Sequence, residues 1–89
     1  MSDRIYNYTY ISTGTTTQVA TGPGVLKAII VGTTAAGAIQ VIDNTSGSTV
    51  NLAELKSSIA EGTYTFNVAF STGLRIITAA ASKITVIWG

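Results

Sequence analysis

Residues 64–70 read Tyr-Thr-Phe-Asn-Val-Ala-Phe, and this stretch decides the fold class. Its large apolar side chains, Tyr64, Phe66, Val68 and Phe70, alternate with smaller or polar residues. Successive side chains of a β-strand point to opposite faces of the sheet, so this alternation places the four large residues on one face. The stretch therefore predicts a β-strand rather than a helix.

The same kind of pattern extends over most of the chain. Further strands are predicted over residues 5–11, 16–20, 25–31, 38–43, 74–78 and 83–88, separated by turns rich in Gly, Ser, Thr, Asn and Asp. The run 25–31 is apolar except for Lys27, which predicts a strand buried on both faces. About seven to eight short strands spaced by turns indicate an all-β protein, a small antiparallel β-sandwich or barrel.

Two turns are marked most clearly by their glycine and proline residues. Pro23 is the only proline, and Gly22 and Gly24 flank it, so a tight turn is expected there. Gly73 closes a second predicted turn, after Ser-Thr. A phosphate-binding loop would continue with Gly-Lys-Ser or Gly-Lys-Thr and open a helix. Neither follows Gly24, so these glycines are assigned to structural turns.

Residues 52–60 leave two alternatives open. Leu52, Leu55 and Ile59 have helical spacing, and Gly62 could end a short helix. An irregular extended loop fits as well, because an isolated helix of this length is weak.

Composition excludes much chemistry. The 89 residues contain no His and no Cys, and only 10% are charged, against roughly 25% in ordinary soluble domains. Without His a Ser-His-Asp triad is impossible, and no zinc site is expected. Asp43 stands alone among neutral oxygen-bearing neighbours, which predicts a local Asx-turn rather than a calcium site. We expect no enzyme activity, no cofactor and no metal.

Size and charge narrow the class of protein further. A chain of 89 residues forms one domain, 1–89. So short a chain buries only a limited apolar area on folding, so its core alone gives marginal stability. Oligomerisation is the usual remedy when disulfides and metals are absent. The net charge of +1 gives no electrostatic reason to bind nucleic acid or an anionic membrane. Neither a signal peptide nor a spanning helix is predicted, so we expect a chain made in the cytoplasm.

Tyr6, Tyr8 and Tyr10 are the candidate contact residues, because they share one face of the predicted strand 5–11. Three destinations are open for them: the protein's own core, a neighbouring subunit or a capsid, and a sugar. Stacking on nucleic-acid bases is disfavoured because no basic residue stands beside them. Residues 1–12 are accordingly treated as part of the domain or as an N-terminal arm or swapped strand.

Four segments carry a resemblance to a known family. They are Gly-Pro-Gly-Val-Leu-Lys-Ala-Ile-Ile-Val at 22–31, Ile-Gln-Val-Ile-Asp at 39–43, Phe-Asn-Val-Ala-Phe-Ser-Thr-Gly-Leu at 66–74 and Ile-Thr-Val-Ile-Trp at 84–88. Together they resemble the small β-sandwich structural proteins of tailed-bacteriophage virions, of the capsid decoration or cement type. The resemblance covers about three quarters of the chain and is a pattern of strands and turns, not a catalytic signature. The segment before Gly14 lies outside it.

The resemblance implies a function that fits the composition. Such proteins sit on the capsid surface, commonly as homotrimers, and bind the major capsid protein. The expected location is thus the virion, and the expected partners are further copies of the chain and the capsid lattice. Two alternatives remain beside it: a head fibre, tail or baseplate component, and a small carbohydrate-binding module that uses the tyrosines.

Overall fold

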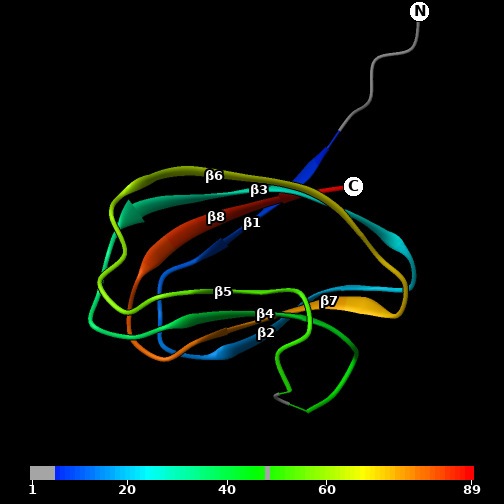
Figure 1. Ribbon diagram of the computed structural model, residues 1–89, viewed down its shortest axis with the longest axis horizontal. Helices are drawn as coiled ribbons and strands as arrows, with labels where there is room; N and C mark the ends of the chain where they lie inside the picture. The colour runs from blue at the N-terminus through cyan, green and yellow to red at the C-terminus, as the bar shows by residue number, and fades with distance from the viewer. Residues whose placement is uncertain (1–5, 48) are drawn as a thin grey trace, which may run out of the picture.

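Eight β-strands supply the regular structure of residues 6–47 and 49–89, the part of the chain that the computed structural model describes (Figure 1). In chain order they are β1 (Asn7–Ile11), β2 (Thr16–Thr21), β3 (Gly24–Thr33), β4 (Ile39–Asp43), β5 (Ala53–Leu55), β6 (Gly62–Phe70), β7 (Gly73–Thr78) and β8 (Lys83–Trp88). Each predicted strand is present, with its ends moved by two residues at most.

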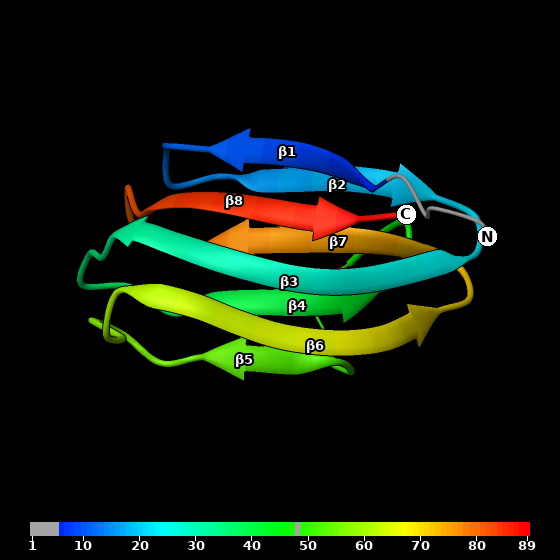
Figure 2. The same ribbon diagram turned by 90° about the horizontal axis from the view of Figure 1, so that it is seen from above.

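The strands form two four-stranded antiparallel sheets with the orders β1-β8-β3-β6 and β2-β7-β4-β5. Figure 2 shows how the sheets stack, with β1 over β2, β8 over β7, β3 over β4 and β6 over β5. Every connection except the one from β4 to β5 crosses from one sheet to the other. This strand order is that of the jelly roll, a double-sheet fold of eight strands. The predicted antiparallel β-sandwich is confirmed.

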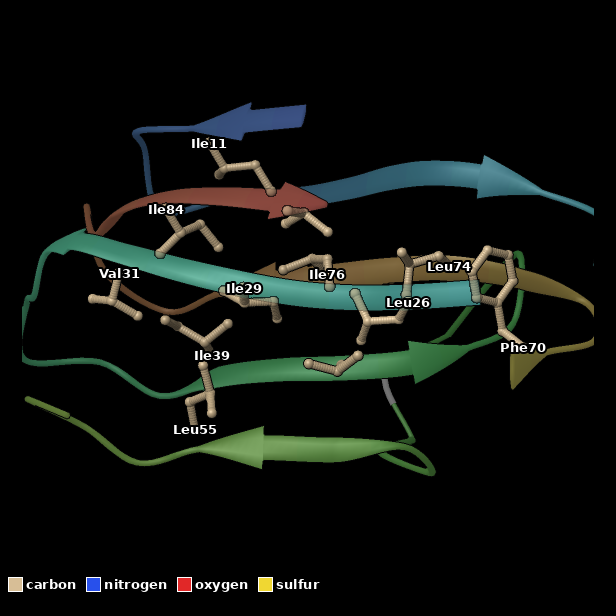
Figure 3. Close-up of a cluster of buried hydrophobic side chains, with 12 residues drawn as sticks. Ile11, Leu26, Ile29, Val31, Ile39, Leu55, Phe70, Leu74, Ile76 and Ile84 are labelled. Carbon is tan, nitrogen blue, oxygen red and sulfur yellow. The ribbon is translucent and has the colours of Figure 1, made fainter. Parts of the chain in front are cut away.

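The core lies between the two sheets and consists of the inward-facing side chains of both (Figure 3). Alternation along each strand supplies these residues, since every second side chain faces the opposite sheet. The buried cluster contains Ile11, Leu26, Ile29, Val31, Ile39, Val41, Leu55, Phe70, Leu74, Ile76, Ile84 and Val86. All but one of them are aliphatic, so almost the whole interior is built from branched apolar side chains.

The prediction that residues 25–31 are buried on both faces is wrong. Leu26, Ile29 and Val31 face the core, but Ile30 points away from it and is 38% exposed. The reason is that β3 lies inside its sheet, while no strand of the described residues forms a second layer over the outer side of that sheet (Figure 2). The bulge at Lys27, where β3 gains a residue against β8, lets the strand carry apolar residues without strict alternation.

The two alternatives for residues 52–60 are also decided. No helix forms there; β5 pairs with β4, and Leu55 lies opposite Ile39 and is buried. The remaining residues up to β6 are irregular, and Ser58 adopts a positive φ of 55°. Pairing with an already formed strand outweighs the weak helical preference of so short a segment.

The N-terminal segment belongs to the sandwich as far as it is described. β1 pairs with β8 of the same chain along its full length, from Asn7 opposite Trp88 to Ile11 opposite Ile84. Ile11 is buried in the core, and the Trp88 indole N–H donates to the Thr9 hydroxyl at 3.2 Å. The arm predicted over residues 1–12 is therefore an edge strand from Asn7 onward, and residues 1–5 lie outside the described residues.

The predicted turn glycines stand where the two sheets meet at one end. Gly22 has a φ of 83°, a conformation that favours glycine. Its N–H donates to the carbonyl of Thr72, in the β6–β7 turn. Gly24 and Gly73 leave no room for a side chain. A Cβ on Gly24 would lie 2.6 Å from the Phe70 ring, and one on Gly73 would lie 2.8 Å from the Ala20 carbonyl oxygen.

Two adjacent isoleucines test this arrangement. Ile29→Ala should lower the free energy of unfolding by about 2–5 kcal/mol, because it leaves a cavity in the core. Ile30→Ala, on the outer side of the same strand, should cost about 1 kcal/mol or less. Chemical denaturation at one fixed protein concentration measures both. Equal losses for the two variants would contradict the assignment of inner and outer faces.

Candidate interaction surface

The described residues offer surfaces rather than cavities. Among residues 6–47 and 49–89 there is no pocket, and no three His, Cys, Asp or Glu side chains lie together. The same residues contain no helix that could cross a membrane. The candidate interaction surfaces are therefore the outer faces of the two sheets, which differ in how they are covered.

The outer face of the β2-β7-β4-β5 sheet is partly closed by the connection from β4 to β5, which projects beyond that sheet in Figure 1. Arg75 holds this connection, since its Nε donates to the Gly47 carbonyl at 2.9 Å. The same guanidinium donates through Nη1 to the Gln18 side-chain oxygen, also at 2.9 Å. Gln18 in turn donates to the carbonyl of Asn44. Ile42, outside the core cluster, is fully buried on this side.

The Asp43 carboxylate links the end of β4 to the β6–β7 turn through hydrogen bonds. It accepts hydrogen bonds from the backbone N–H groups of Ser71, Thr72 and Gly73 and from the Ser71 hydroxyl. The N–H groups of Ser71 and Thr72 are the main reason that the pKa of Asp43 lies below its ordinary value. The predicted local Asx-turn is wrong, because the donors come from the β6–β7 turn about thirty residues along the chain.

Asn51 completes this polar layer from the far end of the β4–β5 connection. Its side-chain oxygen accepts the N–H of Asp43 at 2.6 Å, and its amide nitrogen donates to the Asp43 carbonyl at 3.1 Å. The side-chain amide thus imitates a paired strand at the end of β4. This side of the sandwich is polar, hydrogen-bonded within the chain and partly covered.

The outer face of the β1-β8-β3-β6 sheet is different, because two rows of uncharged side chains cross all four strands. Opposite residues on neighbouring antiparallel strands share a face, so the rows can be followed through the register. The first row runs Tyr8, Ile87, Ala28, Thr65, and the second runs Tyr10, Thr85, Ile30, Thr63. We call these eight residues the tyrosine face.

Exposure separates the predicted tyrosines. Tyr8 is 74% and Tyr10 58% exposed, so of the three destinations open for them the protein's own core is wrong. Tyr6 precedes β1 and is less exposed; the Lys27 ammonium lies 5.6 Å from the centroid of its ring, within the range of a cation–π contact. The described structure thus places Tyr8 and Tyr10 together on the tyrosine face and leaves Tyr6 beside it.

The tyrosine face carries no charge. None of its eight residues is ionisable at neutral pH, and the nearest basic groups in the ladder are Lys27 at the bulge and Lys83 at the other end of β8. Ile30 and Ile87 contribute to this face and were not singled out from the sequence. The signal was present, since both alternate with core residues on their strands, but only the register places them beside the tyrosines.

Comparisons of the chain with protein families, with curated proteins and with solved structures gave no match. The geometry therefore defines the class alone: a small jelly-roll β-sandwich with one polar, internally bonded outer side and one bare, uncharged outer side.

Asp43→Asn tests the polar side. Asparagine cannot accept all of these hydrogen bonds through one oxygen, so the melting temperature should fall by several degrees at pH 7. Because the folded-state pKa is lowered, the carboxylate contributes stability above the unfolded value of about 3.9 and loses it as the pH falls through the folded value. The difference between wild type and variant should therefore shrink in strong acid.

Glu54→Gln is the matched control for this experiment. Glu54 is exposed on β5, and its carboxylate contacts only the Gln40 side chain, at 3.5 Å, among the hydrogen bonds described. The melting temperature of the Glu54→Gln variant should follow that of the wild type at pH 7 and at pH 2. A wild-type advantage over Asp43→Asn that persists unchanged at pH 2 would contradict the role assigned to the carboxylate.

Proposed function

We propose that this protein is a structural subunit of a virion, a decoration or cement protein that binds the major capsid lattice of a tailed phage. The binding unit is the homotrimer that the sequence resemblance implies, and the protein works on the capsid surface. The observation that carries the proposal is the tyrosine face, an uncharged patch on the outer side of one sheet in which Tyr8, Tyr10 and Ile30 are exposed. We assign to it the contact with the shell.

Physical arguments support this use of the tyrosine face. Exposed apolar patches on small proteins mark contact sites, and tyrosine is favoured there because it is rigid and amphipathic. An uncharged face suits a partner that also presents a neutral surface, since no buried charge then needs a counter-charge. The opposite side of the sandwich, closed by the β4–β5 connection, keeps a polar surface toward solvent.

Many weak contacts suffice for such a role. A trimer presents three copies of one face, and simultaneous engagement raises the overall affinity well beyond that of a single contact. Binding to assembled shell, and not to separate subunits, stabilises the assembled state by mass action. The protein would act by clamping neighbouring capsid subunits, without chemistry. The jelly roll is also a common fold of viral capsid and lectin domains, which supports the proposal by analogy alone.

A small carbohydrate-binding module is the second candidate, favoured by one observation. Tyr8 and Tyr10 are exposed side by side on a sheet face, and such rings can pack on the apolar face of a sugar. A head fibre, tail or baseplate component remains the alternative within the virion. Labelling the protein in intact particles for electron microscopy separates that location from the capsid surface.

Ile30→Glu tests the proposed contact. A carboxylate in the middle of the tyrosine face would be buried without a partner on binding, so retention on purified mature capsids should fall by about tenfold or more. Co-sedimentation with capsids measures the retention, and a thermal melt checks that the variant folds. Ser46→Glu, exposed on the β4–β5 connection, is the control and should bind as the wild type does. Loss of binding by Ser46→Glu alone would overturn the assignment of the face.

Tyr8→Ala separates the second candidate from the first. If the tyrosines bind sugar, the wild type should bind defined glycans on an array and this variant should lose that signal. If they contact the shell, no glycan binds and capsid retention falls instead. Glycan binding that survives in Tyr8→Ala would exclude the tyrosines as the sugar platform.

A further inference from the structure

The free edge of β1 is the least protected edge of the sandwich. β1 ends its sheet, with β8 on one side and no described strand on the other. Its pairing with β8 is regular from Asn7 to Ile11, without a bulge. An unprotected edge of this kind is a template for pairing with another strand, which is why most proteins interrupt or charge their edges.

The other three edges are interrupted. β2 carries an extra residue, Val19, between the paired positions Gln18 and Ala20. β6 gains a residue against β3 and places Asn67 at a positive φ of 52°. β5 has three residues and bears Glu54. Bulges, short length and charge are the usual means of keeping an edge from pairing, and β1 has none of them.

The backbone groups that β1 turns outward follow from the ladder. Gly89 and Val25 exchange both of their N–H···O=C hydrogen bonds, so at Gly89 the chain points toward β3. Because these directions alternate along an antiparallel strand, Trp88, Val86 and Ile84 point the other way, toward β1. Their partners on β1 are Asn7, Thr9 and Ile11, which are thereby bonded to β8.

Tyr8 and Tyr10 are the residues between those partners. Their N–H and C=O groups therefore point to the free edge, and no backbone partner is described for them within residues 6–47 and 49–89. The most exposed tyrosines of the tyrosine face thus also carry the unpaired backbone groups of β1.

Neither β1 nor β2 carries a charged side chain. Residues 5–26 contain no Asp, Glu, Lys or Arg. β1 and β2, which lie over one another in Figure 2, both fall within this range. The residues of β1 themselves therefore bring no like charges together when two copies pair through this strand. The opposite side, where β5 and β6 lie, has Glu54 on β5 and Lys56 and Glu61 in the connection that follows.

We propose that β1 pairs antiparallel with β1 of a second copy of this chain, about a two-fold axis through Thr9. In this register Tyr8 lies opposite the partner's Tyr10, and Tyr10 lies opposite the partner's Tyr8. Each opposite pair exchanges two backbone hydrogen bonds, so all four outward groups of each β1 strand are satisfied. A second copy is favoured over an unrelated strand because this register places tyrosine opposite tyrosine and brings no charged residue of β1 into the junction.

The pairing also enlarges the tyrosine face. The two four-stranded sheets become one continuous sheet, and both tyrosine faces lie on the same side of it. Across the junction the tyrosine rings form two cross-strand aromatic pairs, an arrangement that stabilises antiparallel strands. The inference does not depend on the virion role. If a three-fold contact also forms elsewhere on the chain, the β1 contact joins two trimers, so the assembly always has an even number of chains.

Tyr8→Pro is the sharpest test. Proline removes the outward N–H and leaves the bonds between β1 and β8 intact, since edge strands accept proline where the N–H faces outward. Tyr8→Thr is the matched control, because it removes the same ring but keeps the N–H. Native mass spectrometry or sedimentation of the full chain should give even-numbered species for the wild type. The dissociation constant of Tyr8→Pro should be at least about tenfold higher than that of Tyr8→Thr. The reason is that the two-fold symmetry of the contact makes the proline remove two hydrogen bonds.

Hydrogen exchange of the wild type gives a second measurement that does not depend on a variant's folding. The amides of Tyr8 and Tyr10 should be protected at high concentration and exchange fast after dilution, while Thr9 and Ile11 stay protected throughout. Fast exchange at Tyr8 and Tyr10 at every concentration would overturn the proposal. So would a strict monomer or trimer, or equal association of Tyr8→Pro and Tyr8→Thr. A strict trimer that binds capsids would keep the proposed virion role, whereas β1-paired dimers that ignore capsids would refute that role alone.

Discussion

Mutual burial of the two sheets' inner faces is the constraint on which this structure depends. Each strand places every second side chain between the sheets, and these side chains are almost all branched and aliphatic. Because every connection except the one from β4 to β5 crosses from one sheet to the other, only β4 and β5 are both consecutive in the chain and paired with each other. The core forms only when distant segments such as β1 and β8 meet, and the chain contains neither a disulfide nor a helix within its described residues to assist it.

The two outer sides of the sandwich follow from what remains after that burial. On one side the chain folds back over its own sheet, with Arg75 and Asp43 making hydrogen bonds to turns that are far away in sequence. On the other side no described segment folds back, so Tyr10 and Ile30 stay exposed. One side of this small protein has its polar groups hydrogen-bonded within the chain, and the other is uncharged and not covered by any described segment. Such a protein is suited to be a component of a larger assembly. The proposed virion role and the proposed strand pairing both rest on this asymmetry, through a face and an edge that share the same tyrosines.

Several features escaped prediction for a common physical reason. Residues 25–31 are apolar except for Lys27, and the spacing of apolar residues could not distinguish a strand covered by a second layer from one in a sheet with an uncovered outer face. The side chains of Leu52, Leu55 and Ile59 have helical spacing, yet Leu55 enters the core from a three-residue strand because β4 offers it a partner. Asp43 has the neighbours of a local turn, but its carboxylate is bonded to donors on the β6–β7 turn.

Local alternation and turn residues were enough to establish the fold class and the positions of every strand except β5. Period-two patterns such as residues 64–70, the glycines around Pro23, and the lack of His and Cys are properties of neighbouring residues, which the sequence displays directly. The strand order, the bare outer face and the free edge of β1 were decided by the tertiary structure. They depend on which strands lie next to each other, and those pairings join residues as far apart as Asn7 and Trp88, whose relation no local pattern records.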